Sequence, residues 1–305
     1  MQVQICWKQA AFGASRAPPG TRPLYVNLDE TSVCFGQPKS QGWLASLPHR
    51  PAAKYSRQML RGCCTLVSLI CSDSALQPLL PQYIITNGRW LSAAAIAAVN
   101  GLRPPSVVVI RQRSAWNSSA IMCQIIQDLA RALADQQVHI VLYMDTAPIH
   151  LRPVVLAKAK SEGVHIAIVP AGLTWLVQPL DTHCFSGLKQ FLRCRYLEAR
   201  SASGNVSPET FLRILFTVCT KYLCGKRWGS AFSTLGLSEP AGQSGPADLT
   251  KELAKYFPGG KAAIQDVSPP SEAELRAILP RNHQLRIRLW HPRRLRLLSH
   301  GVPVL

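Results

Sequence analysis

The sequence predicts an α/β fold in which a mixed β-sheet carries helices on both of its faces. One observation is that the first third of the chain has strand-length segments rich in apolar residues, at residues 24–33 and 63–71. The other is that apolar runs of strand length at residues 138–144 and 164–169 lie on either side of a helical segment, residues 151–161. A strand, a helix and a second strand in this order imply a right-handed parallel crossover.

Three strands are expected to form an antiparallel meander near the start of the chain. Residues 24–33 (LYVNLDETSV) alternate apolar and polar side chains, which is typical of a strand. The turn-rich residues 36–41 lead to a second short strand at residues 42–47. Residues 63–71 (CCTLVSLIC) form an apolar run that predicts the third strand, and the polar residues 72–74 predict a turn after it.

Helical spacing becomes more frequent in the second half of the chain. Residues 107–110 form a short apolar run that is consistent with one more strand. Apolar side chains between residues 118 and 134 then recur every three or four positions, which predicts a helix with a polar N-cap just before it. Further helices are expected after Pro179 and at residues 211–223. We therefore expect a five-stranded sheet, with three antiparallel strands followed by parallel ones.

One core domain with two irregular ends is the expected organisation. Residues 1–22 carry Pro, Gly and Arg without a period, and we expect them to form a loose leader. Residues 23–237 hold the predicted strands and helices. Residues 238–305 begin as a Pro/Gly/Ser-rich linker and end in an Arg-rich tail, which we expect to be poorly ordered. The tail suits either nucleic-acid contact or an alternating edge strand, because leucines separate its arginines.

The charge balance favours a polyanionic partner. The 305 residues include 34 Lys and Arg against 16 Asp and Glu, a net charge of +18. Of the bases, 23 are Arg, whose guanidinium pairs with phosphate through two hydrogen bonds. A genomic bias towards Arg would produce the same excess. The 47% hydrophobic fraction is ordinary for a globular protein and excludes a disordered chain.

The compartment is expected to be the nucleus or the cytoplasm. The first residues lack the apolar core of a signal peptide, and no run of about 20 apolar residues would span a membrane. The ten cysteines show no C-x-x-C pair and no zinc spacing with His. Several of them lie in apolar runs, as buried thiols in a reducing compartment do. We therefore expect neither a secreted nor a membrane protein, and no small-molecule cofactor.

Three aspartates stand out because of their apolar surroundings. Asp29 lies inside an apolar strand, Asp145 follows the run VHIVLYM, and Asp181 follows Gln-Pro-Leu at the start of a helix. A carboxylate in such a context is costly unless it is paired or binds a metal. If the strands of Asp29 and Asp145 are neighbours, the three acids converge, and a hard cation such as Mg²⁺ or Mn²⁺ would neutralise them. Taken singly, each residue is more often a cap or a turn former.

Three segments together resemble the catalytic core of mariner/pogo-type transposases, the DDE superfamily endonuclease group. They are LYVNLDETSV (24–33), VLYMDTAPIH (141–150) and VPAGLTWLVQPLDTHCFSGLKQFLRCRY (169–196). Asp145 and Asp181 are 181 − 145 = 36 positions apart, which is similar to the spacing of the second and third acids in that group. A later segment, KRWGSAFSTLGL (226–237), also resembles a segment of the family. The resemblance thus covers about residues 22–237.

The resemblance implies an RNase H-like fold and a two-metal site for DNA cleavage and strand transfer. Asp29, Asp145 and Asp181 match the three metal-binding acids, with two Mg²⁺ or Mn²⁺ ions between them. DNA is then the partner, and a homodimer on paired DNA ends is the implied assembly. Only 28 residues precede Asp29, so we expect the family's helix-turn-helix DNA-binding region to be missing from this chain.

Other residues near the predicted acids have two interpretations each. Lys189, Arg193 and Arg195 follow Asp181 and suit phosphate contacts, although a solvated helix face carries the same residues. Trp175 would either stack on a base or pack in the core. His150 and His183 lie near the acids, where a structural or surface role is the simpler interpretation.

Two functions follow from the sequence. The first is a metal-dependent DNA endonuclease and strand transferase. The alternative is a catalytically decayed or domesticated transposase remnant that binds nucleic acid without sequence preference. The intact trio of aspartates favours the first.

Overall fold

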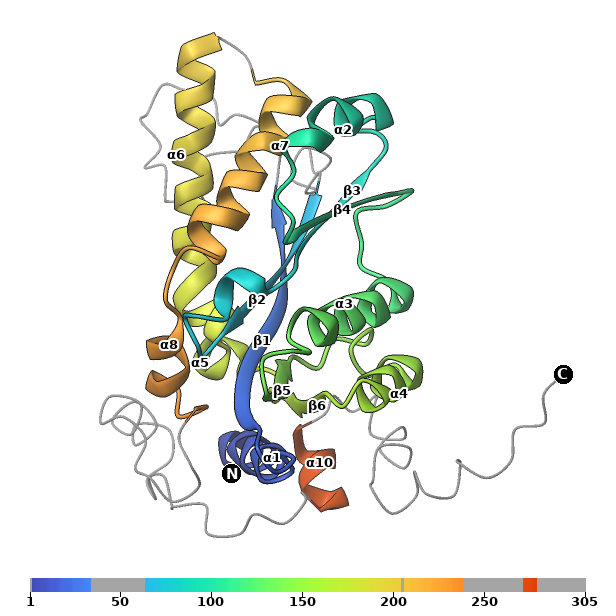
Figure 1. Cartoon of the computed structure of the whole chain (residues 1–305), viewed down its shortest axis with the longest axis vertical. Coiled ribbons are helices and arrows are strands. Elements are labelled where there is room, and N and C mark those ends of the chain that lie inside the picture. Colours follow the sequence, from blue (N-terminus) through green and yellow to red (C-terminus); the bar gives the residue numbers. More distant parts are fainter. Residues whose placement is uncertain (1, 34–63, 204–205, 239–270, 279–305) are drawn as a thin grey trace, which may run out of the picture.

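A six-stranded mixed sheet forms the centre of the computed structural model, which describes residues 2–33, 64–203, 206–238 and 271–278 (Figure 1). The strands lie in the order β4-β3-β2-β1-β5-β6. Their bounds are β1 Arg22–Val33, β2 Cys64–Cys71, β3 Gln82–Asn87, β4 Val107–Gln112, β5 Val138–Met144 and β6 His165–Ile168.

The pairing pattern is that of an RNase H-like sheet. β1, β2 and β3 pair antiparallel in sequence order, and β5 then lies on the other side of β1 in parallel. β6 continues the parallel side next to β5, and β4 adds an edge strand parallel to β3. The predicted fold class is therefore confirmed, and the predicted parallel crossover between β5 and β6 is present.

The number and identity of the strands differ from the prediction of five. The expected strand at residues 42–47 falls outside the described residues. β2 lies between β1 and β3, and no strand was predicted at the position of β3. β3 is only 6 residues long and begins with the polar Gln82, directly after Pro81, so its apolar part is too short to stand out. The run at 107–110 does form a strand, as β4.

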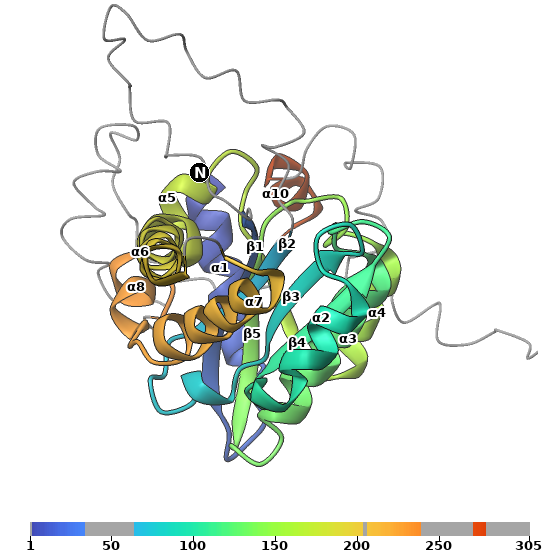
Figure 2. The same ribbon diagram turned by 90° about the horizontal axis from the view of Figure 1, so that it is seen from above.

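Helices cover both faces of the sheet (Figure 2). On one face lie α3 and α4, whose buried side chains form one core with the strands. On the other face α1, α2, α6 and α7 form the second core. The helix bounds are α1 Gln2–Ser15, α2 Ala93–Val99, α3 Ser119–Ala132, α4 Pro153–Ser161, α5 Thr174–Val177, α6 Phe185–Ser203, α7 Pro208–Thr217, α8 Gly229–Thr234 and α10 Glu272–Ile278. None of the described helices combines the length and apolar character that crossing a membrane requires.

The expectation of a loose leader is wrong for residues 2–15, which form α1. Trp7 is buried, and its indole Nε1 donates to the carbonyl of Leu235 at 3.0 Å. The side chain of Gln9 bonds both backbone groups of Ile168 in β6, at 3.0 and 3.2 Å. Apolar side chains of α1 enter both cores, Ile5 in one and Cys6 in the other, so the helix shows no single apolar stripe.

The tail beyond residue 237 also contains ordered structure. α10 packs against α1, with Leu275 and Ile278 buried. Glu274 of α10 forms an ion pair with Lys8 of α1 at 3.2 Å. The expectation of a poorly ordered tail is therefore wrong for this helix. The Arg-rich residues 281–296 lie outside the described residues.

Candidate functional site

Asp29 and Asp145 reach the same end of the sheet because β1 and β5 are parallel neighbours. Asn27 of β1 pairs with Tyr143 of β5. Asp29 lies two residues beyond Asn27, and Asp145 lies two residues beyond Tyr143, so both side chains leave the sheet at equivalent positions. The carboxyl ends of parallel strands are where α/β proteins build their sites.

Asn27 also ties the third acid to this end of the sheet. Its amide Nδ2 donates to the carbonyl of Tyr143 at 3.2 Å, and its Oδ1 accepts the N–H of Leu180 at 2.9 Å. Leu180 begins a π-helical turn, Leu180–Cys184, that continues into α6. Asp181 is the second residue of that turn. The buried Asn27 thus holds the segment carrying Asp181 against β1 and β5.

The three carboxylates interact electrostatically. Burial raises the pKa of Asp29 to about 8, and the negative charges of Asp181 and Asp145 contribute to the increase against one stabilising backbone N–H from Glu30. Partial burial raises the pKa of Asp181, as does the charge of Asp145, while Thr174 and Lys189 act in the opposite direction. The three predicted acids therefore influence one another electrostatically, although they are not arranged as a set of metal ligands.

A buried histidine connects Asp145 with Glu30. His150 is fully buried, and its Nδ1 lies 2.6 Å from Oδ1 of Asp145 while its Nε2 lies 3.2 Å from Oε1 of Glu30. Burial alone would lower the pKa of His150, but the two carboxylates outweigh it and raise the pKa. Burial alone would raise the pKa of Asp145, but His150 and the N–H of Ala147 lower it. The imidazolium therefore neutralises and orients Asp145.

The donor set suits a hard divalent cation, although the site is not preformed. In the part of the chain that the structure describes, no three Asp, Glu, His or Cys side chains are arranged to hold a metal ion as they stand. Carboxylate oxygens are nevertheless the ligands that Mg²⁺ and Mn²⁺ prefer. Burial and the neighbouring acids raise the pKa of Asp29, and no cation among the described residues offsets them. Asp29, Asp145 and Asp181 are the acids that would supply such ligands.

The residues predicted to contact DNA differ in whether they interact with the three aspartates. Lys189 of α6 interacts electrostatically with Asp181. Trp175 of α5 is 59% exposed and donates its Nε1 hydrogen to the carbonyl of Gly172, so the core-packing interpretation is wrong. Arg195 pairs with Glu198 at 2.9 Å. Arg193 is half-buried on the same helix, and nothing in the described structure links it to the acids.

Two residues of this site, Asn27 and Glu30, were not among the predicted site residues. Asn27 shares a strand face with Asp29, a period-two signal that was available. Glu30 is adjacent to Asp29, but its partner His150 lies 120 residues further on, and no local pattern reveals that pair. Of the two roles considered for His150, the structural one agrees with its burial between two carboxylates, and the surface one is wrong. His183 is exposed and bonds only Thr182 among the described residues.

Comparison with known proteins identifies the family of the chain. The family model for the DDE superfamily endonuclease matches residues 64–215, about half of the chain, and includes Asp145 and Asp181. The chain belongs to the DDE superfamily endonucleases. No curated protein matches it.

Two solved structures that resemble the chain are complexes of the Mos1 transposase. The Mos1 paired-end complex with the left transposon end is 15% identical, with a TM-score of 0.39 over 75% of this chain and 62% of that one. The Mos1 mariner paired-end complex with Mn is 15% identical, with a TM-score of 0.40 over 77% and 60%. The chain thus spans about three fifths of the length of these transposases.

Proposed function

We propose that this protein is a metal-dependent DNA endonuclease and strand transferase of the transposase type. The observation that carries the proposal is geometric: the parallel pairing of β1 and β5 puts Asp29 and Asp145 at equivalent positions, and Asn27 ties the turn of Asp181 to both strands. Three carboxylates are held together at a cost unless a cation joins them. Membership of the DDE superfamily endonucleases supports the assignment of phosphodiester chemistry.

The chain's own residues prepare the site for that chemistry. A pair of Mg²⁺ or Mn²⁺ ions on the three aspartates would activate the attacking oxygen and stabilise the leaving oxygen of a phosphodiester. His150 fixes the rotamer of Asp145, and Asn27 fixes the turn that carries Asp181. Lys189 adds positive charge beside Asp181 for the DNA backbone.

The partner and location belong to the same proposal. DNA is the substrate, with Lys189, Arg193, Arg195 and Trp175 as its contacts and a homodimer as the acting form. Recombination of DNA takes place in the nucleus, so we propose that location. Residues 23–237 would act as the catalytic domain.

Plasmid nicking tests the proposed activity. The purified protein should convert supercoiled plasmid to the nicked form in Mg²⁺ or Mn²⁺ and not in EDTA. Asp29→Asn, Asp145→Asn and Asp181→Asn should each lower the rate by at least about 100-fold, because each removes a charge that a cation needs. Asp135→Asn, an exposed acid outside the site, is the matched control and should keep the wild-type rate. Equal nicking by all four variants would assign the activity to a contaminant.

A binding module without catalysis is the second candidate. It is favoured by the absence of a preformed metal site among the described residues and by the imidazolium that already occupies Asp145. Its signature is DNA binding that weakens steeply with salt, without cleavage in either cation.

A further inference from the structure

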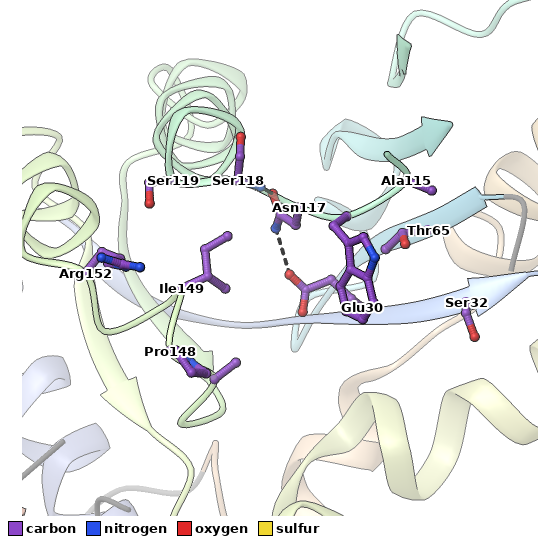
Figure 3. A pocket seen from close by; sticks show the side chains of 12 residues that line it. Glu30, Ser32, Thr65, Ala115, Asn117, Ser118, Ser119, Pro148, Ile149 and Arg152 are labelled. Carbon is purple, nitrogen blue, oxygen red and sulfur yellow. Dashed lines mark hydrogen bonds between the residues drawn. The ribbon is translucent and has the colours of Figure 1, made fainter. Parts of the chain in front are cut away.

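A large cavity lies on the face of β1 opposite to Asp29 (Figure 3). Glu30 follows Asp29 in the strand, so its side chain points to the other face of the sheet, into this cavity. The volume is about 1050 Å³, at the upper end of the range of ligand-binding pockets. Its walls are the ends of β1 and β2, the loop before α3 and the loop between β5 and α4.

The cavity is joined to the predicted catalytic acids by hydrogen bonds. Ala147, which lines it, donates its backbone N–H to Asp145 at 2.9 Å. Glu30 shares His150 with Asp145. The cavity therefore adjoins the residues that hold Asp145 in place.

Trp116 presents an aromatic surface at one end of the cavity. The side chain is 80% exposed, although large apolar side chains are normally buried. The loop that carries it is held in place: Asn117 donates to Glu30 at 2.7 Å and accepts the N–H of Ser118 at 2.8 Å. The backbone oxygen of Trp116 also accepts a hydrogen bond from Gln112. A fixed loop with an exposed indole is a platform for stacking.

The cavity is polarised between an acceptor and a cation. At the Trp116 end, His150 and Asn117 both use Oε1 of Glu30, and no donor in the described structure reaches Oε2. At the other end lies Arg152, which is exposed and has no carboxylate partner among the described residues (Figure 3). Between the two, Pro148 and Ile149 provide an apolar wall.

We propose that this cavity binds one unpaired base of the DNA strand that occupies the catalytic site, an inference that rests on the proposed function in taking DNA as substrate. The base stacks on Trp116 and lies against the apolar wall. Oε2 of Glu30 accepts a hydrogen bond from an exocyclic amino group, as carboxylates do with cytosine. Arg152 pairs with a phosphate of the same strand, as guanidinium groups do. The overall charge of +18 complements that polyanion.

Binding to unpaired and paired DNA ends tests the proposal. Fluorescence anisotropy would be measured in EDTA with a labelled blunt duplex and with the same duplex carrying a short single-stranded overhang. The wild-type protein should prefer the overhang by about 10-fold, because the stacked base adds to the binding free energy. Trp116→Ala should abolish the preference and Trp116→Phe should retain most of it. Trp90→Ala, an exposed tryptophan outside the cavity, should bind as the wild type does.

The outcomes separate this proposal from the proposed function. Equal binding of both ends by the wild type, or a preference that survives in Trp116→Ala, would overturn the base pocket. Competition by a free mononucleotide as strong as that by the overhang would assign the cavity to free nucleotides instead. Because the assay contains no divalent metal, it is independent of nicking by the aspartate variants. Thermal unfolding of each variant verifies that the fold is intact.

Discussion

Gln178 has an environment that is unusual for a buried polar side chain. It lies three positions before Asp181 and is fully buried, yet neither its Nε2 nor its Oε1 has a hydrogen-bond partner in the described structure. A buried amide without partners costs about 1–3 kcal/mol. Proteins retain such groups mainly at sites where a ligand or a water supplies the missing bond.

Replacing Gln178 with an apolar residue tests how much the unpaired amide lowers the free energy of unfolding. Gln178→Leu should raise the free energy of unfolding by about 1 kcal/mol, because it removes the desolvation penalty. Gln77 is the matched control: it is equally buried, but its amide bonds the N–H of Cys71 at 2.7 Å and the carbonyl of Leu69 at 3.1 Å. Gln77→Leu should lower stability by about 1–3 kcal/mol. Urea unfolding of the two variants measures both effects, and equal losses would mean that Gln178 has a partner.

At the residue scale, the sequence was informative where an acid stood in an apolar run. The apolar context of Asp29 and the strand end before Asp145 mark these two acids without knowledge of the fold. The pairing of His150 with Glu30 was not, because it depends on the register of β1 against β5 and on the loop before α4. The anchoring of Asp181 by Asn27 likewise spans 153 residues between Asn27 and Leu180.

At the scale of elements, long strands with a clear period were predictable and short or two-sided elements were not. β1 and β5 have long apolar runs, and both occur where the pattern predicts them. β3 is short and begins with a polar residue. α1 was missed for a different reason: it lies between β6 and α10 and contacts both cores, so its apolar residues are spread around the helix.

The contact between α1 and β6 should weaken in acid. His165 of β6 packs its ring against Phe12, with centroids 5.8 Å apart, and a Cβ at Gly13 would meet the ring at 2.3 Å. Burial lowers the pKa of His165 to about 4, with the charges of His139 and Arg16 adding to the effect. Between pH 6.5 and about 4, His165 is therefore protonated in the unfolded chain but neutral in the folded chain. Because the unfolded state binds the extra proton, the free energy of unfolding falls as the pH falls.

The size of this effect is measurable against a variant. Within that window the wild type should lose up to about 1.4 kcal/mol of stability per pH unit through His165. His165→Gln should lack this component, so the difference between its unfolding free energy and that of the wild type should change across the window. Urea unfolding at several pH values measures the two curves. Parallel curves would show that His165 titrates equally in the folded and unfolded chains.

At the scale of the whole molecule, the excess of 34 basic over 16 acidic residues would govern the DNA binding that we propose. Each phosphate that a Lys or Arg neutralises releases counterions, so log K falls with log salt by about 0.9 for each contact. Lys and Arg side chains that already pair with a carboxylate contribute less to this salt dependence. Lys158 and Arg195 are of this kind, paired with Glu162 at 2.6 Å and Glu198 at 2.9 Å.

Salt titrations of two lysine variants distinguish a contact at the site from the general charge. The positive charge of Lys189 acts on Asp181, near which we propose that the DNA backbone passes. Lys189→Gln should weaken binding of duplex DNA and reduce the salt slope by about 1. Lys158→Gln removes the same charge on α4, where the lysine is paired, and should change the slope by much less. If both variants reduce the salt slope equally, DNA binding depends only on the net charge of the protein. The proposed path of the DNA backbone past Asp181 would then be wrong.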